Sequence, residues 1–166
     1  METRLSEKEK ELVAVAASVA AGCIPCTRYH VKAVQTAGAT LDEVTGAVEV
    51  ALRIKRGAAA VMEGVARTAL GLNADSATAA AAGCGDRVSR LAAIAAAVAV
   101  NCTTSLERYV AIAVGTGIRG DEIRLVVGLA QMIRAKAAEK MDAASKADAA
   151  GAAADPPACG CGSSAC

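Results

Sequence analysis

Residues 11–30 read ELVAVAASVAAGCIPCTRYH, and this stretch predicts two helices joined by a tight turn. Apolar residues recur at helical spacing before Gly22, and Pro25 fits the first turn of a following helix, where no amide proton is needed. If the chain is helical on both sides of Gly22, Cys23 and Cys26 lie one turn apart, as do Cys26 and His30. All three side chains would then meet on one face.

The cysteine pair and the single histidine of the chain form the pattern of a redox site. The thiolate is the reactive species, and a helix N-terminus or a neighbouring base stabilises it. Cys26 is expected to have both, because the second helix begins beneath it and His30 lies one turn later. Glu11, on the preceding antiparallel helix, is expected to orient His30 and take up its proton. Cys23 supplies the second thiol, which converts an oxidised Cys26 into a disulfide that a dithiol then reduces.

Capping patterns set the helices around this stretch. Two S/T-x-x-E boxes predict helix starts just after residues 6 and 40. Gly38 is expected to stop the helix that begins at Cys26. Gly57 is expected to interrupt the long helix that follows residue 40.

An internal repeat organises the rest of the chain. A shift of 79 positions aligns the sequence with itself without a gap, so that Leu12 falls on Leu91 and Cys23 on Cys102. Two copies of one helical unit can bury their apolar faces against each other. The second copy does not keep the chemistry, since it has Arg90, Ser105 and Tyr109 at the positions of Glu11, Cys26 and His30.

The composition favours an all-α fold. Hydrophobic residues make up 54% of the chain, mostly as alanine, and Phe and Trp are absent. Small side chains suit closely packed helices better than a sheet of β-branched and aromatic residues. We expect one helical bundle built from an active repeat (1–72), a linker (73–85) and a degenerate repeat (86–141), followed by a flexible cysteine-rich tail (142–166).

Charge and hydropathy argue against two classes of partner. The net charge is +1, and no basic block or aromatic platform suggests nucleic acid. The longest apolar runs fall short of the roughly 20 residues that a membrane span needs. The sequence before Cys23 has a lipoprotein-like end, but residues 1–11 carry four acidic side chains, unlike a signal peptide. Seven cysteines without an export signal predict a reducing compartment, the cytoplasm.

The pattern E-x11-C-x2-C-x3-H, followed by G-A-T-L-D-E-V, resembles the alkylhydroperoxidase D and carboxymuconolactone decarboxylase family. The resemblance covers residues 5–70 and, in degenerate form, residues 86–140. It implies an all-helical bundle that assembles into trimers or hexamers and needs no cofactor. It also implies a CxxC-containing peroxidase in which peroxide oxidises Cys26, Cys23 resolves it, and Glu11 and His30 relay the proton.

The expected partners are a peroxide or disulfide substrate and a dithiol reductant, either a thioredoxin-like or lipoyl-bearing protein or the chain's own tail. Cys159, Cys161 and Cys166 lie outside the family pattern. They could relay electrons to a Cys23–Cys26 disulfide as a tethered dithiol. Alternatively, they could make the chain a binding protein for a soft metal or metalloid such as copper(I), zinc or trivalent arsenic. A zinc site built from the CxxC pair, the histidine and a tail cysteine is a further alternative.

Overall fold

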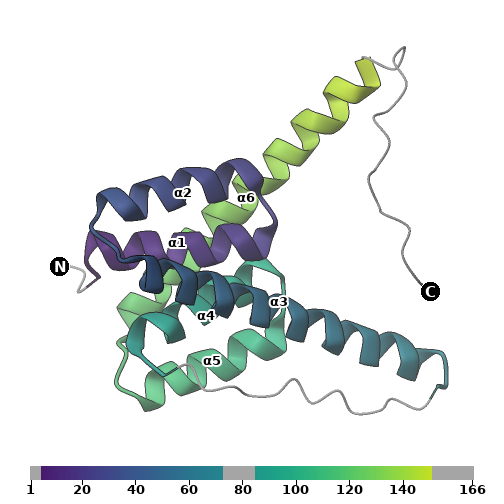
Figure 1. The fold of residues 1–166 in the computed structure, drawn as a ribbon. Helices are drawn as coiled ribbons and strands as arrows, with labels where there is room; N and C mark the ends of the chain where they lie inside the picture. The colour runs from purple at the N-terminus through teal and green to yellow at the C-terminus, as the bar shows by residue number, and fades with distance from the viewer. Residues whose placement is uncertain (1–4, 73–84, 151–166) are drawn as a thin grey trace.

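The computed structural model describes residues 5–72 and 85–150, which form six helices and no strand (Figure 1). The all-α prediction is confirmed. None of the helices in the described part of the chain combines the length and apolarity that crossing a membrane requires. The helices are α1 (Glu7–Ala21), α2 (Ile24–Thr36), α3 (Leu41–Ala69), α4 (Arg87–Ala99), α5 (Thr103–Gly115) and α6 (Gly120–Ala150).

Capping boxes begin α1 and α3, as the sequence predicts. The Ser6 hydroxyl accepts the amide proton of Glu9 at 3.2 Å, and the Glu9 carboxylate accepts that of Ser6 at 2.8 Å. Thr40 and Glu43 make the same two bonds, at 3.2 and 2.8 Å. Each box satisfies amide groups that the first turn of a helix leaves without partners. Gly38 follows α2 with a φ of 81°, the left-handed conformation that ends a helix.

Helices α1 and α4 lie at the centre of the bundle (Figure 1). Every side chain from Leu12 to Ser18 in α1, and from Leu91 to Ala99 in α4, is buried. A helix that is apolar on all sides belongs in the interior, and its many alanines let neighbouring backbones approach closely. The buried hydroxyl of Ser18 donates to the carbonyl of Ala14 at 2.7 Å, so it does not lack a partner. Between residues 12 and 18, α1 thus buries side chains on all of its sides, and not along one apolar stripe alone.

The helices of the two halves follow the 79-residue shift. Helices α2 and α5 begin at residues 24 and 103, and α3 and α6 at residues 41 and 120. Two ion pairs also correspond. Lys8 binds Glu43 at 2.7 Å, and Arg87 binds Glu122 at 2.7 Å. Each pair ties the first helix of a half to the start of its third helix, and Arg87 also contacts Glu9 of α1.

Helices α3 and α6 project beyond the bundle (Figure 1). The expected interruption at Gly57 is wrong, because α3 continues through it to Ala69. Helix α6 likewise continues past Met141 to Ala150. The alanines on either side favour the helix enough to offset one glycine. The division of the chain into repeats, linker and tail stays a prediction.

Candidate active site

The turn between α1 and α2 places two cysteines at the start of α2. Gly22 ends α1 with a φ of 72°, a conformation that residues with a Cβ rarely adopt. Its amide donates to the carbonyl of Val19 and the amide of Cys23 donates to that of Ser18, both at 3.1 Å. Cys23 is then the N-cap of α2, and Pro25 lies in the first turn, as predicted. The chain thus reverses within two residues, and α2 runs antiparallel to α1 (Figure 1).

Cys23 and Cys26 are joined by a disulfide. Cys23 is buried, with 6% of its surface exposed, whereas Cys26 is partly exposed. The amide of Cys26 donates to the sulfur of Cys23 at 3.3 Å. When the disulfide is reduced, this contact and the positive end of the α2 dipole favour a thiolate on Cys23. The pair therefore combines a buried, stabilised sulfur with a more accessible one.

Glu11 of α1 and His30 of α2 face each other across the two antiparallel helices. Oε2 of Glu11 lies 2.8 Å from Nδ1 of His30, and the side chains are only 18% and 15% exposed. An ionised carboxylate can only accept hydrogen bonds, so Nδ1 donates to it, and in the neutral imidazole Nε2 is then the nitrogen that can accept a proton. The ring of Tyr29 packs edge-on against the imidazole, with centroids 5.0 Å apart. The expected contact between the acid and the imidazole is therefore present.

Cys26 and His30 line one groove between α2 and α6. Its volume is about 420 Å³, within the range of small-molecule sites. Glu11 lines an adjoining hollow of about 560 Å³, which shares two α6 side chains with the groove. The accessible cysteine and the imidazole thus face the same space. The groove is lined by Pro25, Cys26, Tyr29 and His30 of α2 and by Leu129, Met132, Ile133, Lys136 and Lys140 of α6.

The α6 side of this groove was not predicted from the sequence. Its residues follow an i, i+3, i+4, i+7, i+11 spacing from Leu129 to Lys140, which marks a single helix face. That spacing is a usable signal for a shared face. It does not say which helix the face lies against, because this depends on packing between segments about 100 residues apart in the chain.

The equivalent place in the second half has no redox pair. Cys102 is the N-cap of α5 and is the free cysteine within residues 5–72 and 85–150. It is buried, and its thiol donates to the hydroxyl of Ser105 at 3.1 Å. Arg90 and the buried Tyr109 occupy the positions of the acid and the base. The second half keeps the helical packing without the second thiol, the carboxylate or the imidazole.

The tail cysteines Cys159, Cys161 and Cys166 lie outside the described residues. Their predicted roles as an electron relay or as metal ligands therefore stay predictions. Among the side chains that the structure describes, no group of three or more His, Cys, Asp and Glu residues could hold a metal ion. The CxxC sulfurs are joined in a disulfide, and a metal ligand would have to be a thiolate.

The model of the carboxymuconolactone decarboxylase family matches residues 1–69, which contain α1 to α3 and the site described above. Residues 1–69 are therefore similar to the carboxymuconolactone decarboxylase family. The predicted resemblance to this family is confirmed over residues 1–69, and members of the family are enzymes. No curated protein and no solved structure matches the chain significantly. Membership of the CxxC-containing peroxidase branch of the family stays a prediction.

Proposed function

We propose that this protein is a thiol-dependent peroxidase, or more broadly a disulfide oxidoreductase, which uses Cys26, Cys23, His30 and Glu11. One observation carries the proposal. The carboxylate of Glu11 lies 2.8 Å from the imidazole of His30, and the imidazole shares a groove with one sulfur of the cysteine pair. A CxxC pair alone also suits structural or metal-binding roles, whereas an oriented imidazole supplies the base that thiol chemistry needs.

Cys26 is the sulfur that we expect peroxide to oxidise. It is partly exposed and lines the groove with His30, whereas Cys23 is buried. Cys23 suits the resolving role, because the Cys26 amide and the α2 dipole stabilise the thiolate that it must form. Peroxide therefore meets Cys26 first.

The reaction follows from these positions. Nε2 of His30 takes the thiol proton of Cys26, and Nδ1 shares its own proton with the Glu11 carboxylate. The Cys26 thiolate attacks one peroxide oxygen, the O–O bond breaks, and the alcohol leaves with a proton. The resulting sulfenic acid on Cys26 is attacked by the Cys23 thiolate, which releases water and forms the disulfide. One peroxide and two thiols thus give one alcohol, one water and one disulfide.

The groove supports an organic hydroperoxide as the substrate. Its α6 wall offers Leu129, Met132 and Ile133 beside the cysteine, and its volume of about 420 Å³ accommodates a small apolar molecule. Apolar contacts with the organic part would lower KM for such a peroxide relative to hydrogen peroxide. A comparison of kcat/KM for cumene hydroperoxide and hydrogen peroxide tests this preference.

Peroxide consumption with a small dithiol as reductant tests the proposed function. Cys26→Ser is expected to abolish turnover, because the attacking sulfur is gone. His30→Ala should lower kcat by about 100-fold or more, the usual contribution of a general base. Glu11→Gln should lower kcat by about tenfold or more. KM should be unchanged, because the Glu11 carboxylate contacts His30 and not the peroxide.

Glu49→Gln is the matched control for the Glu11 variant. Glu49 is exposed on α3, so the same loss of charge should leave turnover unchanged. Undiminished turnover in Cys26→Ser would refute the proposed function. Equal effects of the two Glu→Gln changes would show that Glu11 has no special role.

Three expectations from the family resemblance stay predictions beside this proposal. They are a thioredoxin-like or lipoyl-bearing protein as the reductant, assembly into trimers or hexamers, and a cytoplasmic location. Mass measurement by light scattering tests the assembly, and reduction of the Cys23–Cys26 disulfide by candidate dithiol proteins tests the reductant. The metal-binding alternative predicts a stoichiometric soft metal in protein purified under reducing conditions.

A further inference from the structure

The disulfide lies between two hollows along α6. On the Cys26 side is the groove of about 420 Å³, and on the Cys23 side is a second hollow of about 570 Å³. Both are lined by Pro25 and Lys140, so they adjoin at the start of α2, and we refer to the two hollows together as the trough. We infer that residues 151–166 of the same chain bind in this trough and that their thiols reduce the Cys23–Cys26 disulfide. This inference rests on the proposed function, because it supplies that reaction with electrons.

The length of the chain allows this occupant. The wall of the trough is α6 itself, and from Lys140 to its end at Ala150 the helix advances only about 15 Å. Residues 151–159 then bring the first tail thiol. A flexible segment of nine residues spans about 15–18 Å on average. The segment can therefore turn back along α6 and bring Cys159 to the level of Lys140, which lines the trough on both sides of the disulfide.

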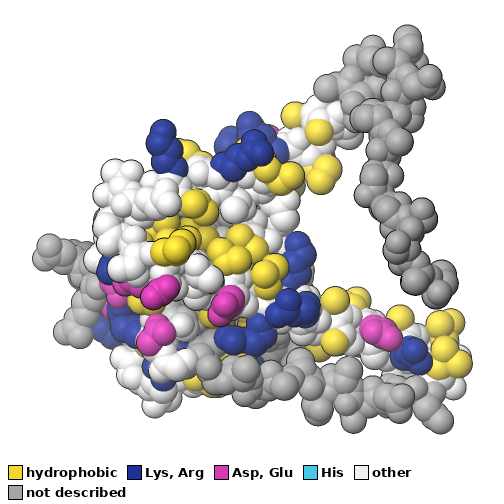
Figure 2. All heavy atoms as spheres, in the orientation of Figure 1, with side chains coloured by type: hydrophobic (Ala, Val, Ile, Leu, Met, Phe, Trp, Pro, Cys, Tyr) yellow, Lys and Arg dark blue, Asp and Glu magenta, His cyan; other side chains and the backbone are white. Residues whose placement is uncertain are grey.

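Charge also favours the tail as the occupant. Residues 151–166 contain one aspartate, Asp155, and no basic side chain. The trough is lined by Arg134, Lys136 and Lys140, and Figure 2 shows basic side chains gathered above the start of α2, where α6 leaves the bundle. Opposite charges on a segment and its groove bring the two together and fix the direction of binding.

The geometry of the disulfide decides which sulfur is attacked. Cys26 is the partly exposed sulfur, and Cys23 is the one that accepts an amide proton at 3.3 Å. A tail thiolate therefore attacks Cys26, the Cys23–Cys26 bond breaks, and the electron pair leaves on Cys23, which then takes a proton. A sulfur leaves a disulfide faster when its thiolate is better stabilised. Cys23 has that stabilisation at the N-terminus of α2.

A second tail thiol completes the exchange. It attacks the tail sulfur of the mixed disulfide, and Cys26 leaves as a thiolate. The CxxC pair has then gained two electrons and the tail holds a disulfide, which an external dithiol reduces. Because the tail is tethered, its effective concentration at the site is on the order of millimolar, far above that of a typical protein reductant.

Trapping the mixed disulfide tests the inference directly. In full-length Cys23→Ser/Cys161→Ser/Cys166→Ser, Cys26 has no resolving partner and the tail keeps a single thiol, so one equivalent of hydrogen peroxide should leave Cys26 linked to Cys159. Peptide mapping by mass spectrometry identifies the link, and a non-reducing gel should show a monomer. Cys26 without a tail partner, or linked only to another chain, would overturn the inference.

Peroxide stoichiometry separates this inference from the proposed function. Fully reduced wild-type protein, freed of reductant, should rapidly consume two equivalents of peroxide, one for each dithiol pair. The triple Cys159→Ser/Cys161→Ser/Cys166→Ser variant should consume one, and the control Cys102→Ser should consume two. One equivalent in all three proteins would overturn the tail inference and leave the proposed function intact. No rapid consumption in any of them would overturn both.

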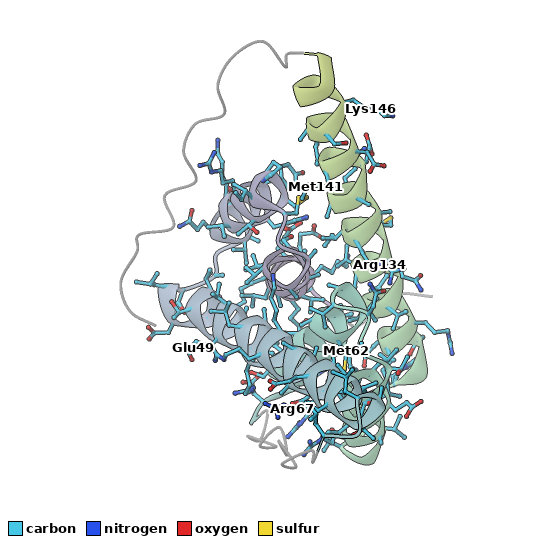
Figure 3. All side chains as sticks on the ribbon, turned by 90° about the vertical axis from the view of Figure 1, so that its right-hand side faces the viewer. Glu49, Met62, Arg67, Arg134, Met141 and Lys146 are labelled. Carbon is cyan, nitrogen blue, oxygen red and sulfur yellow. A yellow bond between two sulfur atoms is a disulfide. The ribbon has the colours of Figure 1, made fainter. Side chains whose placement is uncertain are left out.

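A pair of charge reversals tests the trough. Lys140→Glu should slow capture of Cys26 by the tail about fivefold, the scale of one exposed ion pair. Lys32→Glu makes the same change at an exposed position of α2 that lines neither hollow, and it should leave the rate unchanged. Figure 3 shows Met141 pointing from α6 towards α2. Equal slowing by both variants would overturn binding in the trough.

Discussion

Arg87 and Lys8 hold equivalent places in the two halves, and we predict that their removal has very different consequences. The side chains of the Arg87–Glu122 pair are 34% and 4% exposed, whereas those of the Lys8–Glu43 pair are both 37% exposed. Removing one partner of a buried pair leaves a charge without compensation, which costs about 3–5 kcal/mol. Water reaches Arg87 in part, so we expect Arg87→Ala to lower the free energy of unfolding by about 3 kcal/mol. Lys8→Ala should lower it much less, because water reaches both partners of that pair.

Denaturant titration of the purified protein, followed by circular dichroism, measures both changes. The double variant Arg87→Ala/Glu122→Gln should recover part of the loss, because no buried charge is then stranded. The amide oxygen that this change introduces can still accept the Arg119 amide proton, which Glu122 accepts at 3.2 Å. Equal effects of the Arg87 and Lys8 variants, or no recovery in the double variant, would refute the reasoning.

Two further predictions concern acid stability and glycine conformation. The side-chain hydrogen bond from Lys8 holds the pKa of Glu43 below its ordinary value of 4.5, so this contribution to stability is full above about pH 4.5 and is lost as the pH falls through the folded-state pKa. Lys8→Met should therefore make the loss of stability between about pH 5 and pH 3 shallower in denaturant titrations, and an unchanged slope would contradict this. Gly22→Ala should destabilise the fold by about 1 kcal/mol, because its φ is 72°. Gly46→Ala, in α3 with nothing within 4 Å of the added Cβ, should stabilise it by about 0.5–1 kcal/mol, and the same sign for both glycines would refute the conformational argument.

Local rules predicted most of the framework of the site. The capping boxes at Ser6 and Thr40, the left-handed Gly38 and the place of Pro25 in α2 all depend on residues within one turn of each other. The contact between Glu11 and His30 was also within reach of sequence reasoning. A two-residue connection makes consecutive helices lie side by side and antiparallel. Glu11 of the first helix could therefore be expected to face His30 of the second.

The errors and omissions share another cause. Gly57 is a helix-weakening residue, yet α3 runs through it because the surrounding alanines and the packed N-terminal half stabilise the helix. Tyr29 is 69% exposed and contacts the imidazole of His30, a placement that the sequence did not indicate. In both places the outcome depends on how much neighbouring structure covers the residue, and a local pattern does not contain that information.

By itself the sequence determined where the helices of the first half begin, where α1 turns into α2, and which acid, base and thiols are brought within a few turns of each other. Hydrogen bonds and spacings between near neighbours decide those features. Only the tertiary structure decided that α1 is buried on all sides, that Cys23 is covered while Cys26 is partly exposed, and that α6 supplies the other wall of the groove. These features arise from the summed packing of helices far apart in the chain, and no short segment specifies which of them will meet.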